Sequence, residues 1–382
     1  MTTRLLAAPI FAALFACGSD DTSTPDVPDV DTAFDVDITP DTTDTDTDTP
    51  DIPVGTSFDR LVARYDLLTT IAGKGAVRDL GNEWLPSYEG GPATAAELSR
   101  PHMAMADSLG RVFIADKEAH AIRRVDPDGT IHTVAGTGQV GDDGDGPGLA
   151  SAMRLVDPNG LYVTADDIVF IVDLGNGKIR RLDGDQMTTF ITVPDGITTG
   201  RGLWVSGDEK LAYIASETKV LKWQSGVGLR TFATGFDALG NLDVDSDGTL
   251  FVTDRGGHYV YRLSASGTPT IIAGNGTTLG GGDGFPATAS ALEEPRALAF
   301  TGDGGLLIGT HEGNQVWWLA PEGTLHLFLD GGDNHAHAGD GRFFRSPGEK
   351  VSEVRSITVD HEGNILIVEN DFGYVRKVAR RR

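Results

Sequence analysis

The chain has 382 residues, of which 39% are hydrophobic and 50 are glycine, and its formal net charge is −25. This length and apolar content allow a large core, and the many glycines favour short strands joined by tight turns. The negative charge argues against binding to nucleic acid or to an anionic membrane surface, because both need a basic face. Part of that charge is local, since residues 18–53 carry twelve Asp and neither Lys nor Arg.

The first residues have the features of an export signal. Arg4 precedes an apolar run at 5–15, which is too short to span a bilayer core of about 30 Å and therefore predicts the core of a signal peptide. Residues 14–17 read LFAC and resemble a bacterial lipobox, in which a signal peptidase cuts before a lipidated cysteine. We expect a signal peptide at 1–16 and a lipid on Cys17. The alternative is an ordinary secretory signal with an incidental thiol.

Residues 17–55 predict a solvated linker. The segment is rich in Asp, Thr, Pro and Val, cannot bury enough apolar surface to fold, and is extended by like-charge repulsion. Its alternating Asp residues lack the glycine turns and the closing carboxylate of a calcium-binding loop. We expect this linker to hold a folded domain, residues 56–382, away from a membrane to which only the lipid attaches it.

Beyond the linker, a pattern of turn, apolar strand and small or acidic terminal residue returns six times. The six copies of this strand end at Asp116, Asp173, Ser216, Asp254, Thr310 and Glu369. Repeats of strand and turn that return roughly every 40 to 60 residues are typical of a β-propeller. We predict an all-β fold of six blades, each with four antiparallel strands that we call inner, second, third and outer.

The sixth unit ends after its third strand, at 374–378, so its outer strand must come from elsewhere. Residues 67–73 read LLTTIAG and repeat the outer strands at 131–136, IHTVAG, and 270–274, TIIAG. The N-terminal strand is therefore expected to complete the last blade and to close the ring, which removes free sheet edges.

From 66 to 378, approximately, these residues resemble the NHL-repeat propellers. The likeness is strongest in AGTG at 135–138, in GPATAAEL at 91–98 and in the strand pair at 114–126, and the GPATA form is similar to the subgroup named after the teneurin NHL domain. The resemblance implies a six-bladed propeller. It leaves the function open, because such propellers include protein-binding platforms, RNA-binding domains and a peptide-amidating lyase.

Several His and Asp residues recur where the repeat needs them. His120 and His258 each follow the last residue of a second strand by four positions, which is the place of the His in the family's Asn-His-Leu signature, and this implies a structural role. The acids that end the second strands are expected to accept backbone N–H bonds and to fix loops. Asp243, Asp245 and Asp247 resemble the start of a calcium loop, but they belong to an inner strand and its turn, so we expect a regular hairpin.

The sharpest metal candidate is a histidine-rich loop with His335, His337 and Asp340. Residues two apart in an extended segment face the same side, so the two imidazoles could share one ion. Against this, the GDG sequence at 339–341 repeats the one at 144–146. We predict no cofactor and keep a divalent metal, Zn²⁺ or Ca²⁺, at this loop as the alternative.

Two features break the sixfold pattern, and the first is the length of the connections from an outer strand to the next inner strand. These connections are long before blades 1, 2, 5 and 6 and short before blades 3 and 4, at 194–200 and 235–237. In propellers they share one face, which we call the top face. We expect that face to carry high walls on one side and a cleft over blades 3 and 4.

The second feature is the first position of each inner strand, which points toward the mouth of the central channel. In chain order this channel-mouth ring is His102, Asn159, Arg201, Gly240, Arg296 and Arg355. Guanidinium groups suit carboxylate or phosphate ligands. The alternative is that each Arg pairs with a neighbouring acid such as Glu369 or Asp173.

These features predict an exported protein that is lipid-anchored to the bacterial cell envelope, at the outer membrane or the cell surface. A monomeric propeller would bind a protein, peptide or glycan, with an anionic group favoured, on its walled top face. The alternative is a metal-dependent enzyme of the lyase or lactonase type with its site at the channel mouth, where His311 and the histidine-rich loop could join His102 as ligands. The sequence shows no nucleophile–base signature.

Overall fold

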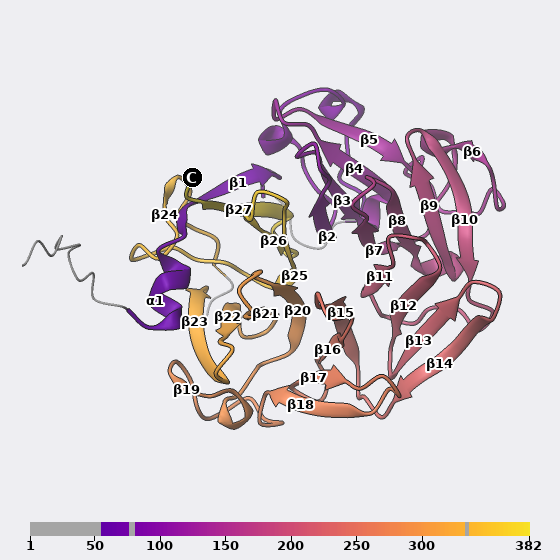
Figure 1. Cartoon of the computed structure of the whole chain (residues 1–382). Helices are drawn as coiled ribbons and strands as arrows, with labels where there is room; N and C mark the ends of the chain where they lie inside the picture. Colours follow the sequence, from indigo (N-terminus) through magenta and orange to yellow (C-terminus); the bar gives the residue numbers. More distant parts are fainter. Residues whose placement is uncertain (1–54, 76–80, 333–335) are drawn as a thin grey trace, which may run out of the picture. The chain divides into compact units, whose positions relative to one another are not determined.

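The computed structural model describes residues 55–75, 81–332 and 336–382, so the predicted signal peptide, Cys17 and nearly all of the linker lie outside the described residues. Six antiparallel sheets of four or five strands stand in a ring around a central axis (Figure 1). This confirms the predicted all-β, six-bladed propeller. Among the residues described, helical structure is limited to α1 (Ser57–Val62) and short 3₁₀ turns. Within the described ranges, no helix is long and apolar enough to cross a bilayer.

Blades 1 to 5 run from their inner to their outer strand in chain order, whereas blade 6 takes its outer strand from the N-terminal side of the chain. Blade 1 has β2 (Pro101–Ala106), β3 (Val112–Asp116), β4 (Ala121–Val125) and β5 (Ile131–Ala135), and blade 2 has β7 (Pro158–Val163), β8 (Val169–Asp173), β9 (Lys178–Asp183) and β10 (Gln186–Thr192). Blade 3 has β11 (Leu203–Val205), β12 (Leu211–Ser216), β13 (Lys219–Gln224) and β14 (Gly228–Thr234), and blade 4 has β15 (Leu239–Val244), β16 (Leu250–Asp254), β17 (Tyr259–Leu263) and β18 (Pro269–Ala273). Blade 5 has β20 (Pro295–Phe300), β21 (Leu306–Thr310), β22 (Gln315–Leu319) and β23 (Thr324–Asp330), and blade 6 has β25 (Val354–Val359), β26 (Ile365–Glu369), β27 (Tyr374–Arg380) and β1 (Tyr65–Ala72).

The core consists of apolar layers between neighbouring blades. Both faces of each sheet are covered, so the second strands read as continuous apolar runs and not as alternating patterns. Every residue of β8 is buried, for example. The central residues of the six second strands are fully buried, namely Ile114, Ile171, Ile214, Val252, Ile308 and Ile367.

The N-terminal strand closes the ring as predicted. β1 pairs antiparallel with β27, with Thr69 opposite Lys377. Leu68 is completely buried in the layer between blades 5 and 6, whereas its neighbour Leu67 is 39% exposed. Ahead of β1, helix α1 lies beside β23, where Phe58 stacks on His326 with ring centroids 4.6 Å apart (Figure 1).

The extra residues of the long connections do not form the walls on the top face that the sequence suggested. They reach the outer edges of the blades, where β6 (Gly148–Leu149) pairs with β10, β19 (Phe285–Pro286) with β23, and β24 (Arg342–Phe343) with β1. Before blade 1, Pro92 bridges Thr130 in the same way. Blades 3 and 4, which follow the short connections, keep four strands. The lengths were predicted correctly, but the inferred wall and cleft are corrected, because the inserted residues cover sheet edges.

Three of these connections also tie one blade to the next. The carbonyl of Ala150 accepts the N–H of Gly136, at the end of β5, and its own N–H donates to Asp185 O in blade 2, at 3.0 and 2.8 Å. Ala93 and Ala287 make the corresponding pairs of bonds between blades 6 and 1 and between blades 4 and 5. The Ala residues of the GPATA-like motifs are thus buried inter-blade links.

Candidate functional site at the channel mouth

The channel-mouth ring comes together in the structure. His102, Asn159, Arg201, Arg296 and Arg355 are all buried, with exposed fractions between 2% and 9%. Arg201 reaches from blade 3 to the opposite blade 6, where its Nη1 donates to the backbone oxygen of Arg355 at 2.9 Å. The channel is therefore narrow at this level, and these side chains fill its mouth.

A repeated backbone conformation aims the ring residues at the channel. In five of the six blades, the residue two positions before the ring residue has a positive φ, between 37° and 57°. These residues are Arg100, Asp157, Thr199, Glu294 and Glu353. Non-glycine residues rarely adopt this conformation, so its recurrence marks a sharp turn at the start of five of the six inner strands.

The ring position of blade 4, Gly240, is set by close packing. A Cβ there would lie 2.9 Å from the Cα of Arg296 and 2.6 Å from Thr253 Oγ1. On the other side of the ring, His102 Nδ1 bonds Asn159 Oδ1, and Asn159 Nδ2 donates to Gly200 O at 2.7 Å. These bonds couple blades 1, 2 and 3.

The positive charge of the ring is only partly compensated. Arg296 Nη2 lies 2.5 Å from Glu294 Oε2, and Arg355 Nη2 lies 3.8 Å from Glu353 Oε2. Arg201 has no carboxylate within ion-pair distance in the part of the chain that the structure describes, and burial followed by the charges of Arg355 and Arg296 lowers its pKa well below the usual range. Among the described residues, Arg201 is thus a buried guanidinium without an ion-pair partner, and the charge of Glu294 offsets the neighbouring arginines only weakly.

Three nitrogen atoms of the ring are buried without a hydrogen-bond partner among the described residues: Arg201 Nε, Arg355 Nε and His102 Nε2. A buried polar atom left unpaired costs about 1–3 kcal/mol. Burial, Arg355 and Arg201 lower the pKa of His102 well below its usual range, so its imidazole is neutral. Since Nδ1 donates to Asn159, Nε2 is an acceptor. The ring therefore offers two N–H donors and one acceptor to a ligand.

The acids at the ends of the second strands fix loops, as expected. Asp116 accepts the N–H of Ser99, and Asp173 that of Val156, at 2.6 and 2.8 Å. Ser216 continues the series, since its Oγ accepts the N–H of Thr198. These acids do not pair with the ring arginines. The alternative drawn from the sequence still holds for two of the three arginines, because Arg296 and Arg355 pair with other neighbouring acids.

Sequence reasoning missed the partners of three of these acids. Asp116, Asp173 and Glu369 each pair with a buried Arg seven residues later, namely Arg123, Arg180 and Arg376, at 3.1, 2.8 and 2.8 Å. In the other blades, the corresponding third-strand residues are Trp223, Tyr261 and Trp317. The seven-residue spacing of acid and Arg was a visible signal in the sequence.

His120 and His258 have the structural role that the resemblance implied. Nδ1 of His120 accepts the N–H of Asp157 at 3.1 Å, and Nδ1 of His258 accepts that of Glu294 at 3.3 Å. Both bonds link one blade to the turn before the next inner strand.

The histidine-rich loop is described only in part, since His335 lies outside the described residues. His337 stacks on Tyr374 with ring centroids 3.7 Å apart, and Asp340 lies 3.3 Å from Arg376 Nη2. Arg376 Nη1 is also 3.0 Å from His337 Nδ1. His337 and Asp340 thus both contact the guanidinium of Arg376, whose positive charge would repel a metal ion. A metal at this loop stays an untested prediction.

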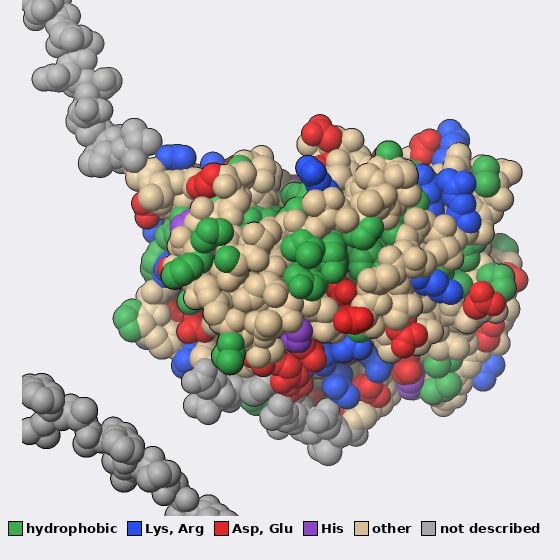
Figure 2. Space-filling model, turned by 90° about the horizontal axis from the view of Figure 1, so that it is seen from below, with side chains coloured by type: hydrophobic (Ala, Val, Ile, Leu, Met, Phe, Trp, Pro, Cys, Tyr) green, Lys and Arg blue, Asp and Glu red, His purple; other side chains and the backbone are tan. Residues whose placement is uncertain are grey.

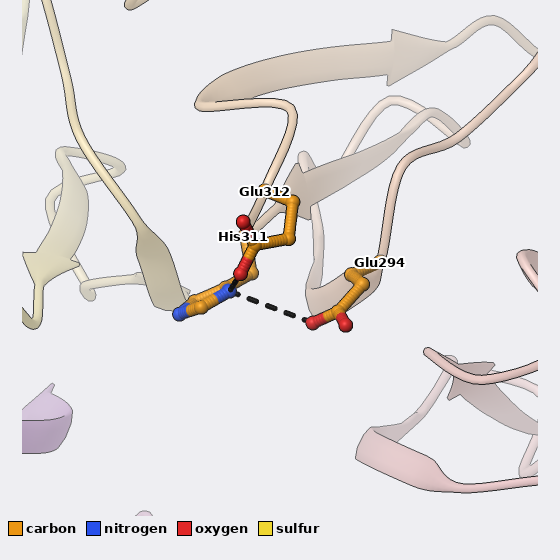
Figure 3. A group of neighbouring side chains, drawn as sticks. All are labelled: Glu294, His311 and Glu312. Atoms are coloured by element: carbon orange, nitrogen blue, oxygen red, sulfur yellow. Dashed lines mark ion pairs between the residues drawn. The ribbon is translucent and has the colours of Figure 1, made fainter. Parts of the chain in front are cut away.

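A different group on the top face has metal-binding geometry. One ligand atom each from Glu294, His311 and Glu312 lies within 4.8 Å of the others (Figure 3). His311 Nδ1 is 3.5 Å from Glu294 and 3.0 Å from Glu312, and its Nε2 is 3.0 Å from Glu353. His311, followed by Arg296, lowers the pKa of Glu294 to about 2, so this carboxylate is ionised. Two carboxylates and an imidazole are suitable ligands for Zn²⁺.

The sequence is similar to parts of much longer proteins. No family model matches the chain. It is 25% identical to Teneurin-m of Drosophila melanogaster over 253 residues, and this alignment covers 60% of this chain and 8% of that protein. Over 87 residues it is 32% identical to Protein SUPPRESSOR OF QUENCHING 1, chloroplastic, of Arabidopsis thaliana, covering 22% and 8%. These alignments span less than a tenth of either relative.

Solved structures share the propeller fold at low identity. A structural-genomics protein of unknown function from Bacteroides thetaiotaomicron has a TM-score of 0.66 at 15% identity, covering 83% of this chain and 76% of that chain. An auxiliary nutrient binding protein from the same organism has a TM-score of 0.61 at 16%, covering 83% and 77%. A streptogramin B lyase has a TM-score of 0.51 at 14%, covering 74% and 94%. At these identities the likeness concerns the fold alone.

Proposed function

We propose that this protein is an NHL-type propeller that acts as a binding module, and that its channel-mouth ring recognises an anionic group of a protein, peptide or glycan. Arg201 carries the proposal, because it is 3% exposed and has no ion-pair partner among the described residues. Desolvating a cation is costly unless a partner compensates it, and a carboxylate of a ligand would do so. The likeness to an auxiliary nutrient binding protein supports a binding role.

The hydrogen-bonding groups of the ring narrow the ligand further. The unpaired Nε–H groups of Arg201 and Arg355 suit a carboxylate, and the acceptor His102 Nε2 suits a hydroxyl. A ligand that carries both groups close together would satisfy all three atoms. Among the candidate partners, we favour an acidic glycan.

Glucuronate is expected to raise the melting temperature of the protein by a few degrees, whereas glucose is not. Saturation at 100 times Kd stabilises a protein by about 2.7 kcal/mol. The shift should vanish in Arg201→Gln and persist in Arg181→Gln, which alters a partly exposed ion pair of blade 2. Thermal unfolding with each sugar measures this. An equal response to glucose, or a full response of Arg201→Gln, would contradict the proposal.

We also propose that the chain is exported and anchored in the cell envelope by a lipid on Cys17. The apolar run and the LFAC sequence support this. Intact mass measurement of the mature protein should give a chain that starts at Cys17 and carries acyl groups. A mature chain with another first residue, or without acyl groups, would refute the anchor.

A metal-dependent enzyme with its site on the top face is the second candidate, and the group in Figure 3 favours it. If the group is a metal site, Zn²⁺ should bind with a stoichiometry of about one, and His311→Gln should weaken binding by at least tenfold. The control is His132→Gln, since His132 is a partly exposed imidazole in blade 1. Calorimetric titration of the metal-free protein decides. If Zn²⁺ does not bind, or binds equally to both variants, the metal-dependent enzyme is refuted and the binding module remains as the proposed function.

A further inference from the structure

The end of the channel away from the ring opens into a pocket of about 770 Å³. Each of the six inner strands contributes an apolar side chain to its wall, namely Met103, Leu161, Leu203, Leu242, Leu298 and Ile357. The turns that follow β15 and β20 border it, which places the pocket on the face opposite to the top face. A volume of this size and an apolar lining are typical of sites for small organic molecules.

The pocket extends from the channel into the gap between blades 4 and 5. This gap is open because Asp243 of blade 4 lies where the inner strand of blade 2 has Tyr162 and that of blade 3 has Trp204. Ala299, the equivalent residue of blade 5, faces the layer toward blade 6. Ala320 and Gly323 continue the opening along blade 5. Figure 2 views the outer rim of the disc from the side of β18 and β19 and shows a group of apolar side chains there. Within β18, Ile271 is 40% exposed.

One carboxylate lies in the apolar part of this pocket. Asp243 of β15 accepts the N–H of its neighbour Val244 through Oδ1 at 2.8 Å, which is its one hydrogen bond among the described residues. Burial, with a contribution from the charge of Asp245, raises the pKa of Asp243 to about 7. Burial and then the charge of Asp243 raise the pKa of Tyr162, in the same pocket, to about 12. The second oxygen of Asp243 is thus left for a ligand.

The other charged groups around Asp243 do not neutralise it. Asp245 is held in the turn, where its Oδ1 accepts the N–H groups of Asp247 and Thr249 at 2.9 and 2.8 Å. Asp247 and Arg262 also line the pocket and are exposed. Within the part of the chain that the structure describes, Arg262 forms no ion pair with any of these acids. The pocket therefore combines apolar walls with uncompensated negative charge.

We infer that this pocket is a second binding site, specific for a small organic cation with an apolar body, whose ammonium group pairs with Asp243. The alkyl or aromatic body of the ligand would fill the gap between blades 4 and 5, where burial contributes about 25 cal/mol per Å² of apolar surface. A neutral ligand would leave the carboxylate unpaired, and an anion would be repelled. The inference does not depend on the function proposed for the ring.

Three probes with the same alkyl chain test the charge preference: n-octylammonium, n-octanol and n-octanoate, titrated calorimetrically into the full-length protein. At pH 8.5 n-octylammonium should bind at least tenfold more tightly than the other two. Its affinity should fall about tenfold at pH 6, because a carboxyl with a pKa of about 7 is then mostly protonated and cannot pair with the cation. Equal affinities of the three probes, or tighter binding at pH 6, would overturn the inference.

Two substitutions locate the site. Asp243→Asn should remove both the preference for the cation and its pH dependence. Asp208→Asn, in the exposed turn that follows the inner strand of blade 3, should preserve both. If Asp243→Asn does not fold, Ala299→Leu provides the second test, because it enlarges a side chain that lines the pocket and should weaken the binding of n-octylammonium by at least tenfold. Unchanged binding of n-octylammonium to either pocket variant refutes this site.

Discussion

Replacing Arg180 by Ala is expected to lower the free energy of unfolding by about 3–5 kcal/mol. Arg180 is completely buried and its Nε lies 2.8 Å from Asp173, which is also completely buried. It further donates to Gly144 O and Thr189 Oγ1, at 2.6 and 2.7 Å, and so joins three strands to the connection before blade 2. Its removal leaves a buried carboxylate without a counter-charge, and that loss accounts for the large effect.

The next residue in the strand provides the control. Arg181 pairs with Glu209 at 2.9 Å, but both side chains are about 30% exposed. Arg181→Ala should therefore cost less than about 1 kcal/mol. Urea unfolding of the three proteins at pH 7 measures the difference. Equal losses in the two variants would show that the buried pair has no special role.

Leu68→Ala is expected to destabilise the protein by about 2–5 kcal/mol, the range for removing a buried Leu side chain. Leu68 is fully buried in β1, and the ring closes through this strand. The loss should also expose the edge of β27 in a fraction of molecules, so association on heating should increase.

Leu67→Ala is the matched control, because the adjacent side chain points to the other face and is 39% exposed. It should cost less than about 1 kcal/mol and should not promote association. Denaturant unfolding and light scattering during heating test both statements. Similar behaviour of the two variants would contradict the role given to the closing strand.

The sequence predicted those parts of the fold that repeat. The match between residues 67–73 and the other outer strands was enough to place β1 beside β27, since equivalent strands occupy equivalent places in every blade. For the same reason, His102, Arg201 and Arg355 could be assigned to one ring before the structure was known. Aligning the repeats therefore predicts contacts between residues that are more than a hundred positions apart in the chain.

The sequence did not predict features that depend on direction or on side-chain size across blades. Connection lengths alone do not tell whether inserted residues stand on the top face or turn outward to pair as β6 and β19 do. The pocket beside Asp243 is completed by Leu298, which belongs to the neighbouring blade and lies more than fifty residues away. The partners of Arg296 and Arg355 were missed because the turn before each inner strand brings Glu294 and Glu353 back toward the ring.

The way the chain enters the ring has a mechanical consequence. The segment that precedes residue 55 continues into α1, which stacks Phe58 on His326 of blade 5, and only then into β1 of blade 6. Any force that pulls on the chain from its N-terminal side must first detach this short helix before it loads the eight residues of β1. With the lipid anchor proposed on Cys17, tension between the membrane and the propeller would act on α1 before it acts on β1. The helix would thus protect the closing strand from being pulled out of blade 6.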